Sequence, residues 1–368
     1  MDTAATFDRI LVVATRQIGD VLLTTPLVRA ARRRWPRARI EVLGFQGTLG
    51  MLAGNPDVDA TIELPARLGW RGGIAAFRRL WRRYDLALIT DVGDRAHALG
   101  WVAARQRSGI VAPDESGTPW KRRLLDHAVI AAGDRGIVHT VVEKHALLAP
   151  WLDASNPVPP VTAPAAVPLP PELASVLRPG AVVVHAPSMW SYKQWPIEHY
   201  ADLVRGLIAQ GRQVVLTGSS SARDQECIAP LRAMGTAPDL VDTSGQLGFG
   251  QIVTLLRQAA LYVGPDTSVS HLAAATGVPV VALFGPSNPM RWAPWPAVTE
   301  QPINWVQSGG TQGNGNVTVL QARLPCVPCG RAGCEDHRAS RADCLPLITP
   351  DRVLAEVDRL APRPSAPA

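Results

Sequence analysis

The stretch LYVGPDTSVSHLAAATGVPVVALFGP, from Leu261 to Pro286, alternates apolar runs with short polar turns. Leu261 to Val263 and Val280 to Phe284 are apolar runs rich in β-branched residues and closed by Gly-Pro pairs, which is typical of buried strands. The residues between them predict a helix from His271 to Thr276 that ends at Gly277. The polar turn before this helix presents free backbone N–H groups and a positive helix end, an arrangement that suits a phosphate.

The polar residues of this turn have two possible roles. Either Asp266 only caps the helix and His271 is an ordinary buried histidine, or the turn binds an anionic ligand. The segment DTSVSHLAAATGVPVVALFGPSNP resembles the motif D-[ST]-G-x-x-H-L-A-A-A-x-G-x-P-x-x-x-L-F-G-P-T of glycosyltransferase family 9, the ADP-heptose:lipopolysaccharide heptosyltransferases. Ser268 departs from the motif, which has Gly there, so we expect a tighter or differently bonded turn.

Four further segments resemble family 9 in chain order. They are IGDV from Ile18, NPDVD from Asn55, KQWP from Lys193 and a cysteine-rich C-terminus. The resemblance implies a GT-B architecture, in which two doubly wound parallel-sheet (Rossmann-like) domains face a cleft. Strands alternate with helices in both halves of the sequence, and this alternation by itself predicts an α/β fold with two such sheets.

The domain boundaries follow from composition. Residues 157–171 contain seven prolines and almost no charge, which predicts a semi-rigid linker. Residues 1–156 would then form the acceptor-binding domain, and residues 172–348 the nucleotide-sugar-binding domain, with these roles implied by the resemblance. Residues 349–368 would form a final helix, Pro350 to Leu360, and a frayed tail. The resemblance implies that this helix packs back on the N-terminal domain.

Composition and charge narrow the class of protein. The chain has 368 residues, of which 46% are apolar, so we expect globular domains. No apolar run is long enough for a transmembrane helix and the N-terminus lacks a secretory pattern, so we expect a cytoplasmic protein. Residues 1–160 carry 22 Lys and Arg against 16 Asp and Glu, whereas residues 161–368 carry 15 of each. The net charge of +6 therefore arises in the first half, which we expect to meet an anionic partner.

Basic residues of the first half fall in three clusters, within residues 29–34, 78–83 and 121–123. They are either solvated helix faces or a surface that docks on a phosphorylated acceptor held in an anionic membrane. The second alternative predicts a peripheral location at the inner face of the cytoplasmic membrane. No nucleic acid partner is expected.

Glycosyl transfer needs a base for the acceptor hydroxyl and positive charge for the departing diphosphate. Asp20 lies in the turn after the first predicted strand, Arg9 to Ala14. It matches the Asp of the family's I-G-D-V, which the resemblance implies is the base of an inverting transfer. The alternative from the residues alone is that Asp20 is the N-cap of the helix that starts at Val21.

The phosphate contacts are expected in the second half. Lys193 matches the Lys of K-x-W-P and is implied to contact the donor phosphate, the alternative being a surface lysine. Thr267 and Ser268 would hold other phosphate oxygens through the helix start. Asp266 would brace the turn or bind the sugar, and His271 would donate to phosphate or lock the turn. The full set of predicted donor-binding residues is Ser188, Lys193, Gly218, Asp224, Asp266, Thr267, Ser268 and His271.

Further residues are predicted to contact the ribose and the acceptor. Gly218 would admit a ribose and Asp224 is a candidate for the ribose hydroxyls. The predicted acceptor-binding residues are Arg16, Asp91 and Arg95. A fixed array of positive groups stabilises a departing diphosphate, so no cofactor is expected for catalysis.

The cysteines form a separate group. Cys326, Cys329, Cys334 and Cys344 have a spacing that fits a structural zinc or iron knuckle, with His337 as a substitute ligand. The alternative is a set of reduced, partly buried thiols. A closed tetrahedral site would leave no position for substrate, so any metal would be structural.

Three functions remain open. The first is an inverting heptosyltransferase that uses ADP-heptose and a lipopolysaccharide inner-core acceptor, or a related glycan or protein acceptor. The second is another GT-B nucleotide-sugar enzyme such as an epimerase, which would need a second acid/base pair. Asp91, Asp94 and Glu226 are the candidates for that pair. The third is a non-catalytic nucleotide-sugar-binding subunit, which would not need a carboxylate at Asp20.

Overall fold

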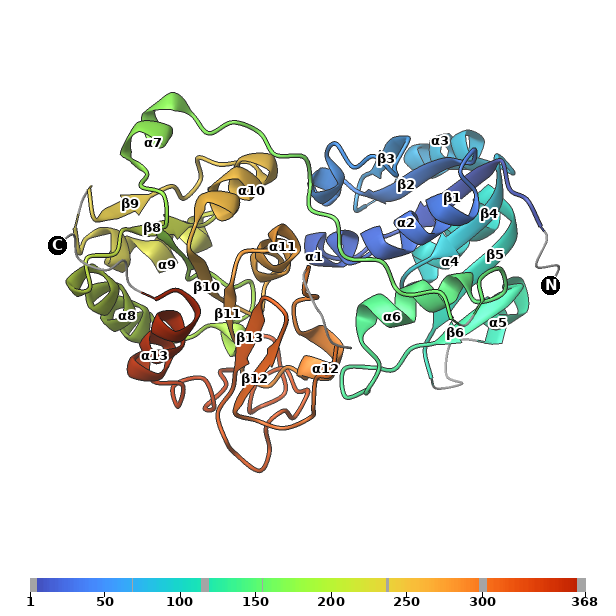
Figure 1. Cartoon of the computed structure of the whole chain (residues 1–368). Helices are drawn as coiled ribbons and strands as arrows, with labels where there is room; N and C mark the ends of the chain where they lie inside the picture. The colour runs from blue at the N-terminus through green and yellow to red at the C-terminus, as the bar shows by residue number, and fades with distance from the viewer. Residues whose placement is uncertain are drawn as a thin grey trace. The chain divides into compact units, whose positions relative to one another are not determined.

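The computed structural model describes residues 5–67, 69–113, 119–153, 155–235, 238–297 and 303–362. The chain divides into two compact units, Met1–Pro164 and Ala165–Ala368. The division falls inside the proline-rich segment 157–171, and the finer domain bounds given above stay a prediction. Figure 1 shows the course of the chain and labels its helices and strands.

In the described part of the first unit, six strands form one sheet in the order β3-β2-β1-β4-β5-β6, and every pair is parallel. The strands are β1 (Arg9–Val13), β2 (Arg39–Phe45), β3 (Ala60–Leu64), β4 (Tyr84–Ile89), β5 (Ala104–Val111) and β6 (His127–Ile130). The helices are α1 (Ile18–Leu22), α2 (Thr25–Arg34), η1 (Leu49–Leu52), α3 (Trp70–Leu80), α4 (Asp94–Ala103), α5 (Pro119–Leu124), α6 (Thr140–His145) and η2 (Ala146–Leu148).

The first sheet is buried on both faces because its central strands are mostly apolar. Ile10 and Val12 of β1 join a core that includes residues of α2 and η2. Leu11 and Val13 point to the opposite face and join a core with residues of α3 and α4. Each such side chain contributes about 1.5–3 kcal/mol when fully buried. Continuous apolar strands covered by helices on both faces are what a parallel sheet requires.

The described part of the second unit has a seven-stranded sheet in the order β12-β13-β11-β10-β7-β8-β9. The strands are β7 (Val182–His185), β8 (Val214–Thr217), β9 (Leu240–Asp242), β10 (Leu261–Pro265), β11 (Val280–Leu283), β12 (Thr311–Asn314) and β13 (Val317–Leu320). The helices are α7 (Pro171–Val176), η3 (Ser191–Lys193), α8 (Ile197–Ala209), α9 (Ala222–Arg232), α10 (Phe249–Gln258), α11 (Ser268–Thr276), α12 (Pro289–Trp292) and α13 (Pro350–Leu360).

Both sheets reverse their strand order at one place. In the first sheet this switch point lies between β1 and β4, and in the second it lies between β7 and β10. Helices on the two sides of a switch point diverge, which leaves the strand ends there open to a ligand. The turns after these four strands are therefore the candidate site of each unit.

Two sequence-based expectations need correction. The helical spacing of residues 21–35 predicts one helix with Pro26 either early in it or at a kink, but the chain forms α1 and α2 with a break between them and Pro26 in the first turn of α2. The Gly- and Asn-rich composition of residues 307–316 predicts a mobile loop, but part of this segment forms β12, which pairs antiparallel with β13. This antiparallel strand at the sheet edge also departs from the expected wholly parallel sheet.

The last helix, α13, packs in the second unit. Its buried residues Val353 and Val357 belong to the same core as Leu203 and Val204 of α8. Arg212 Nη2 lies 3.0 Å from Asp358 Oδ1 and donates to the carbonyl of Ala361 at 2.6 Å. A further crossing of this helix to the first unit stays a prediction. The tail from residue 363 lies outside the described residues.

Across the described ranges, no helix has both the length and the apolar character that spanning a bilayer requires.

Candidate functional site

A buried ion pair lies at the switch point of the second sheet. Asp266 directly follows β10, and its side chain is 5% exposed. Lys193 ends η3 in the connection that follows β7, the neighbouring strand, and its Nζ lies 2.6 Å from Asp266 Oδ2. Ser287, beyond β11, donates to the same oxygen at 2.6 Å. The connections after three adjacent parallel strands thus meet at one carboxylate.

The charge of this carboxylate is fixed by its neighbours. Burial alone would raise the pKa of Asp266, but the Lys193 ammonium, the Ser287 hydrogen bond and the nearby His271 together hold that pKa below its usual value. Asp266 is therefore ionised at neutral pH. Its partner Lys193 is 22% exposed, so the ammonium keeps a face toward solvent while the carboxylate does not.

The start of α11 lies next to this pair. Its N-cap is Thr267, with extended backbone, and no side-chain hydrogen bond caps the helix in the described residues. The first turn holds no acidic residue. The backbone N–H groups of Ser268 and its successors therefore remain available at the positive end of the helix dipole. The alternative that Asp266 caps this helix is wrong, because its carboxylate is paired with Lys193.

Other residues of the turn are held by packing. Ser270 donates to the carbonyl of Pro265 at 2.5 Å and lies 3.0 Å from the hydroxyl of Tyr262. His271 is buried, and its charge acts on Asp266. Gly277 ends α11 with φ 86°, as expected of a left-handed helix terminus. Ser268 begins the helix, so Gly is not required there for a left-handed backbone.

The other predicted donor-binding residues have local partners. The Ser188 hydroxyl is buried and lies 3.3 Å from the backbone N of Trp190. A Cβ on Gly218 would lie 2.4 Å from Ile228, so packing explains the absence of a side chain there. Asp224 accepts from the backbone N of Ser219 at 2.8 Å and braces the turn after β8. Their contacts with a donor stay a prediction.

Asp20 lies at the switch point of the first sheet, in the third position of α1. The N-cap of that helix is Gln17, so the alternative that Asp20 is the N-cap is wrong. Its carboxylate Oδ1 lies 3.6 Å from the Nζ of Lys144, which is 3% exposed. The same ammonium donates to the Asp20 carbonyl at 2.6 Å and to the Thr24 hydroxyl at 3.2 Å. Lys144, on α6, thus holds both the backbone and the side chain of Asp20.

The predicted acceptor-binding residues do not share one role. Asp91 follows β4 and is buried, and its two oxygens accept from the Thr15 hydroxyl at 2.7 Å and the Gly93 backbone N at 2.8 Å. It therefore links the turns after β1 and β4. Arg95 lies over the ring of Phe45 and donates to the carbonyl of Ala66. Arg16 is exposed in the turn after β1, close in sequence to Asp20.

Among the described residues, the cysteine-rich segment shows no metal site. All five cysteines are free, and no group of three or more His, Cys, Asp or Glu side chains among the described residues is arranged to hold a metal. Cys326 and Cys334 are exposed, whereas Cys344 is buried. Burial, followed by the neighbouring Cys329, raises the pKa of Cys344 to about 12.

Comparisons with known proteins decide the family. Residues 103–312, more than half of the chain, match the model of Glycosyltransferase family 9 (heptosyltransferase). The chain belongs to glycosyltransferase family 9. The resemblance found in its motifs is confirmed, and this family 9 protein is accordingly a glycosyltransferase.

Named relatives and solved structures similar to this family 9 glycosyltransferase support the same family assignment. Lipopolysaccharide heptosyltransferase 2 of Escherichia coli K12 is 30% identical over 303 residues, covering 76% of this chain and 84% of the relative. The structure of E. coli ADP-heptose lps heptosyltransferase II is 24% identical with a TM-score of 0.70 and covers 96% of this chain and 98% of that chain. E. coli heptosyltransferase WaaC with ADP is 18% identical with a TM-score of 0.67, covering 96% and 100%. The two α/β units thus have the GT-B fold class.

Two residues of the family 9 protein were missed by sequence reasoning. Lys144 lies 124 positions from Asp20, and Ser287 lies 21 positions from Asp266. Both act through contacts that only the packed sheet creates. A signal existed for Lys144, since a lysine in the apolar segment TVVEKHALL is poorly placed unless it has a buried partner.

The Asp266–Lys193 pair should contribute stability that depends on pH. The folded pKa of Asp266 lies below the unfolded value of about 3.9, so the contribution is present above that pH and is lost as pH falls through the folded pKa. Asp266→Asn should lower the free energy of unfolding by about 3 kcal/mol at pH 7. The difference from the parent should shrink below about pH 4. Chemical unfolding measured across this pH range checks both statements.

Asp239→Asn is the matched control. Asp239 pairs with Arg178 at 3.2 Å, but both side chains are about half exposed. Its loss should cost less than about 1 kcal/mol at any pH. Equal effects of the two substitutions at pH 7 would contradict a structural role for the buried pair.

Proposed function

We propose that this family 9 glycosyltransferase transfers heptose from ADP-heptose to a hydroxyl of a lipopolysaccharide inner core, or of a related glycan or protein acceptor. The observation that carries this proposal is the Lys193–Asp266 pair beside the uncapped start of α11, at the switch point of the second sheet. A switch point is the common place for a nucleotide in a doubly wound sheet. The relative solved with ADP supports the choice of nucleotide.

The chemistry of the donor side follows from charge. When the bond between the sugar and the diphosphate breaks, negative charge develops on the departing ADP. The ammonium of Lys193 and the N–H groups at the start of α11 are positive groups held in fixed positions, which stabilise that charge without reorganisation. Asp266 would hold the ammonium in place through its own buried charge rather than contact a phosphate, since like charges repel.

The acceptor side needs a base. Asp20 is a carboxylate on a rigid helix at the end of β1, and its side chain is 15% exposed. As general base it would take the proton of the acceptor hydroxyl while the oxygen attacks the anomeric carbon and the diphosphate leaves with the bonding electrons. A single displacement of this kind inverts the anomeric configuration. Lys144 would act as a positioning residue that keeps the carboxylate oriented.

The two alternative functions have weaker support. An epimerase would need a second acid/base group, but Asp91 holds two turns together and Asp94 Oδ1 lies 2.6 Å from the buried Lys121. Glu226 is exposed on α9. A non-catalytic binding subunit would not need the arrangement around Asp20.

Product analysis after incubating the protein with ADP-heptose and truncated lipopolysaccharide tests the proposal. Recovery of unmodified acceptor would contradict it.

A membrane-held acceptor is supported by one surface of the first unit. Trp70, Ile74, Phe77 and Trp81 recur at helical spacing along α3 and just beyond it, and all are exposed. Trp101 of α4 lies against Trp81, with ring centroids 6.4 Å apart. Exposed arginines, Arg71 and Arg78 on α3 among them, accompany this stripe. Aromatic side chains beside basic ones suit an anionic bilayer surface, so we propose peripheral contact there. Some arginines of the other basic clusters form ion pairs within the protein, as Arg29 does with Asp57.

Asp20→Asn should keep the fold and the affinity for ADP but lower turnover by about 10²–10⁴-fold, as expected when a general base is removed. The amide is close to the carboxylate in shape, and the backbone contact between Lys144 and residue 20 would remain. Steady-state kinetics with calorimetry of ADP checks both parts. Asp134→Asn, at an exposed position of the same unit, is the control. Full turnover in the Asp20 variant would contradict the assignment.

Lys193→Ala should weaken binding of ADP and ADP-sugar by about 1.5–3 kcal/mol, the value of a lost charge-assisted hydrogen bond. Titration calorimetry measures the change. Because this variant also leaves Asp266 without the ammonium, the double substitution Lys193→Met with Asp266→Asn is the control, since it removes both charges of the pair. If the double variant regains parental affinity, Lys193 does not contact the phosphate.

Salt should affect the two substrates differently. Attraction between the arginines of α3 and an anionic acceptor is exposed to solvent, and the Debye length falls from about 10 Å at 0.1 M to about 3 Å at 1 M salt. Donor binding at a partly buried pair should be screened less. We expect salt to raise the KM for acceptor more than the KM for ADP-heptose. An equal rise for both substrates would contradict this expectation.

A further inference from the structure

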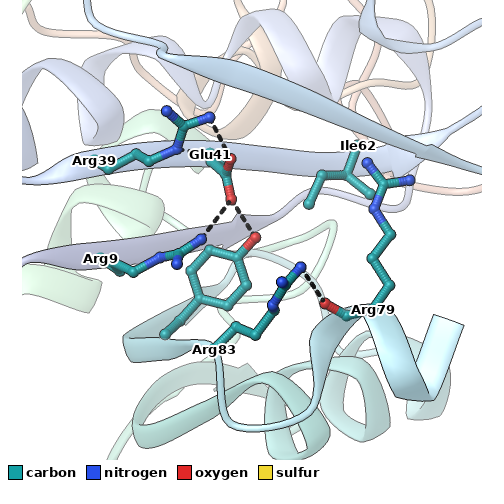
Figure 2. Close-up of a pocket in the computed structure, with 7 residues that line it drawn as sticks. Arg9, Arg39, Glu41, Ile62, Arg79 and Arg83 are labelled. Atoms are coloured by element: carbon teal, nitrogen blue, oxygen red, sulfur yellow. Dashed lines mark hydrogen bonds and ion pairs between the residues drawn. The ribbon is translucent and has the colours of Figure 1, made fainter.

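A charged pocket lies at the amino ends of the strands of the first sheet, whereas Asp20 lies beyond the carboxyl end of β1. Its volume is about 440 Å³, and Figure 2 shows the side chains around it. Arg9, Arg39 and Tyr84 are the first residues of β1, β2 and β4, so the pocket opens at the amino ends of these strands. The full lining is Arg9, Arg39, Glu41, Ile62, Arg79, Arg83 and Tyr84.

One carboxylate organises the floor of this pocket. Glu41 is 7% exposed, and Arg39 Nη2 lies 3.0 Å from its Oε1 while Arg9 Nη2 lies 3.9 Å from its Oε2. The Tyr84 hydroxyl also donates to Oε2 (Figure 2). Burial alone would raise the pKa of Glu41, but Tyr84 and the two arginines outweigh it, and the pKa is lowered. Glu41 is therefore ionised and neutralises one of four guanidinium charges.

Two of the arginines have no acidic partner. Among the described residues, no ion pair involves Arg79 or Arg83, and Arg83 donates only to the backbone carbonyl of Arg79, at 3.3 Å. The Nε of Arg9 is buried without a hydrogen-bond partner in the same part of the chain. The pocket thus has a formal surplus of three positive charges and several unused N–H donors.

We propose that this pocket is a second anion site, which binds a phosphate monoester or diphosphate group. Such groups carry two or three negative charges at neutral pH and match the surplus, whereas a single carboxylate would neutralise only part of it. The planar fork of a guanidinium gives two parallel hydrogen bonds to phosphate oxygens, and Arg is the residue that this geometry favours. Arg79 and Arg83 are the phosphate contacts, and Glu41 holds Arg39 and Arg9 in place beneath them.

The site is separate from the proposed reaction centre. The five residues of β1, from Arg9 to Val13, lead from this pocket to the turn before Asp20, and they span roughly 16 Å at about 3.3 Å per residue. The phosphate in this pocket is therefore not the one that leaves in glycosyl transfer. It comes either from a soluble phosphate compound or from a lipid headgroup, and the proposal does not depend on the proposed activity.

Calorimetry with inorganic pyrophosphate tests the site in the full chain. The parent should bind pyrophosphate at this pocket and at the Lys193 site. Arg79→Gln with Arg83→Gln should weaken the first event at least tenfold, because two charge-assisted contacts are lost, and leave the second unchanged. Lys193→Met with Asp266→Asn should do the reverse. This pairing separates failure of the pocket from failure of the donor site.

Arg37→Gln with Arg105→Gln is the matched control, because both arginines are exposed, lie in the same unit and lie outside the pocket. The proposal is overturned if Arg79→Gln with Arg83→Gln binds pyrophosphate like the parent, or if the control loses as much. Sedimentation with vesicles that contain phosphatidic acid, whose phosphate is a monoester, against phosphatidylcholine vesicles then identifies the source. Weaker binding to phosphatidic acid in the pocket variant alone points to a lipid phosphate, and equal binding in all variants points to a soluble one.

Discussion

Parallel pairing of the central strands is the constraint on which both units depend. Two parallel strands run in the same direction, so the chain must cross back from the end of one strand to the start of the next. The carboxyl ends of all such strands therefore lie at the same end of the sheet. Where the strand order reverses, the turns after two neighbouring strands are not covered by the same helix layer. Asp20 follows β1 and Asp266 follows β10, and both positions are consequences of this rule. Both acidic groups therefore lie on rigid scaffolds, Asp20 in α1 and Asp266 directly after β10.

A lysine pairs with the acidic residue at each switch point. Lys144 is 3% exposed beside Asp20, and Lys193 is 22% exposed beside Asp266. A fully buried ammonium must be paired, whereas a partly exposed one keeps donors for a ligand. The difference in exposure accords with the proposed roles, since Lys144 is enclosed beside its carboxylate and Lys193 keeps one side toward solvent. The Asp20–Lys144 pair thus belongs to the acceptor side of the proposed reaction, and the Asp266–Lys193 pair belongs to its donor side.

The sequence predicted the fold well because its strands are continuous apolar runs. Leu261 to Pro286 gave the strand–turn–helix–strand unit with its helix end at Gly277. Local patterns also placed Asp20 and Asp266 in turns, but they suggested capping for both. They could not show the partners, because Lys144 and Ser287 are brought close only by tertiary packing. The cysteine spacing left a metal knuckle and a set of reduced thiols both open, since spacing carries no information on which thiols become buried.

The antiparallel hairpin of β12 and β13 has a consequence for how the protein behaves at high concentration. β12 is the outermost strand of its sheet, and an open strand edge is a template for pairing with another molecule. Here the side chains of the strand close the edge. Gln312 and Asn314 accept hydrogen bonds from the backbone N of Val306 and of Asn304, both at 2.9 Å. The neighbouring segment thus covers the ladder, so this edge is protected against aggregation by edge-to-edge association.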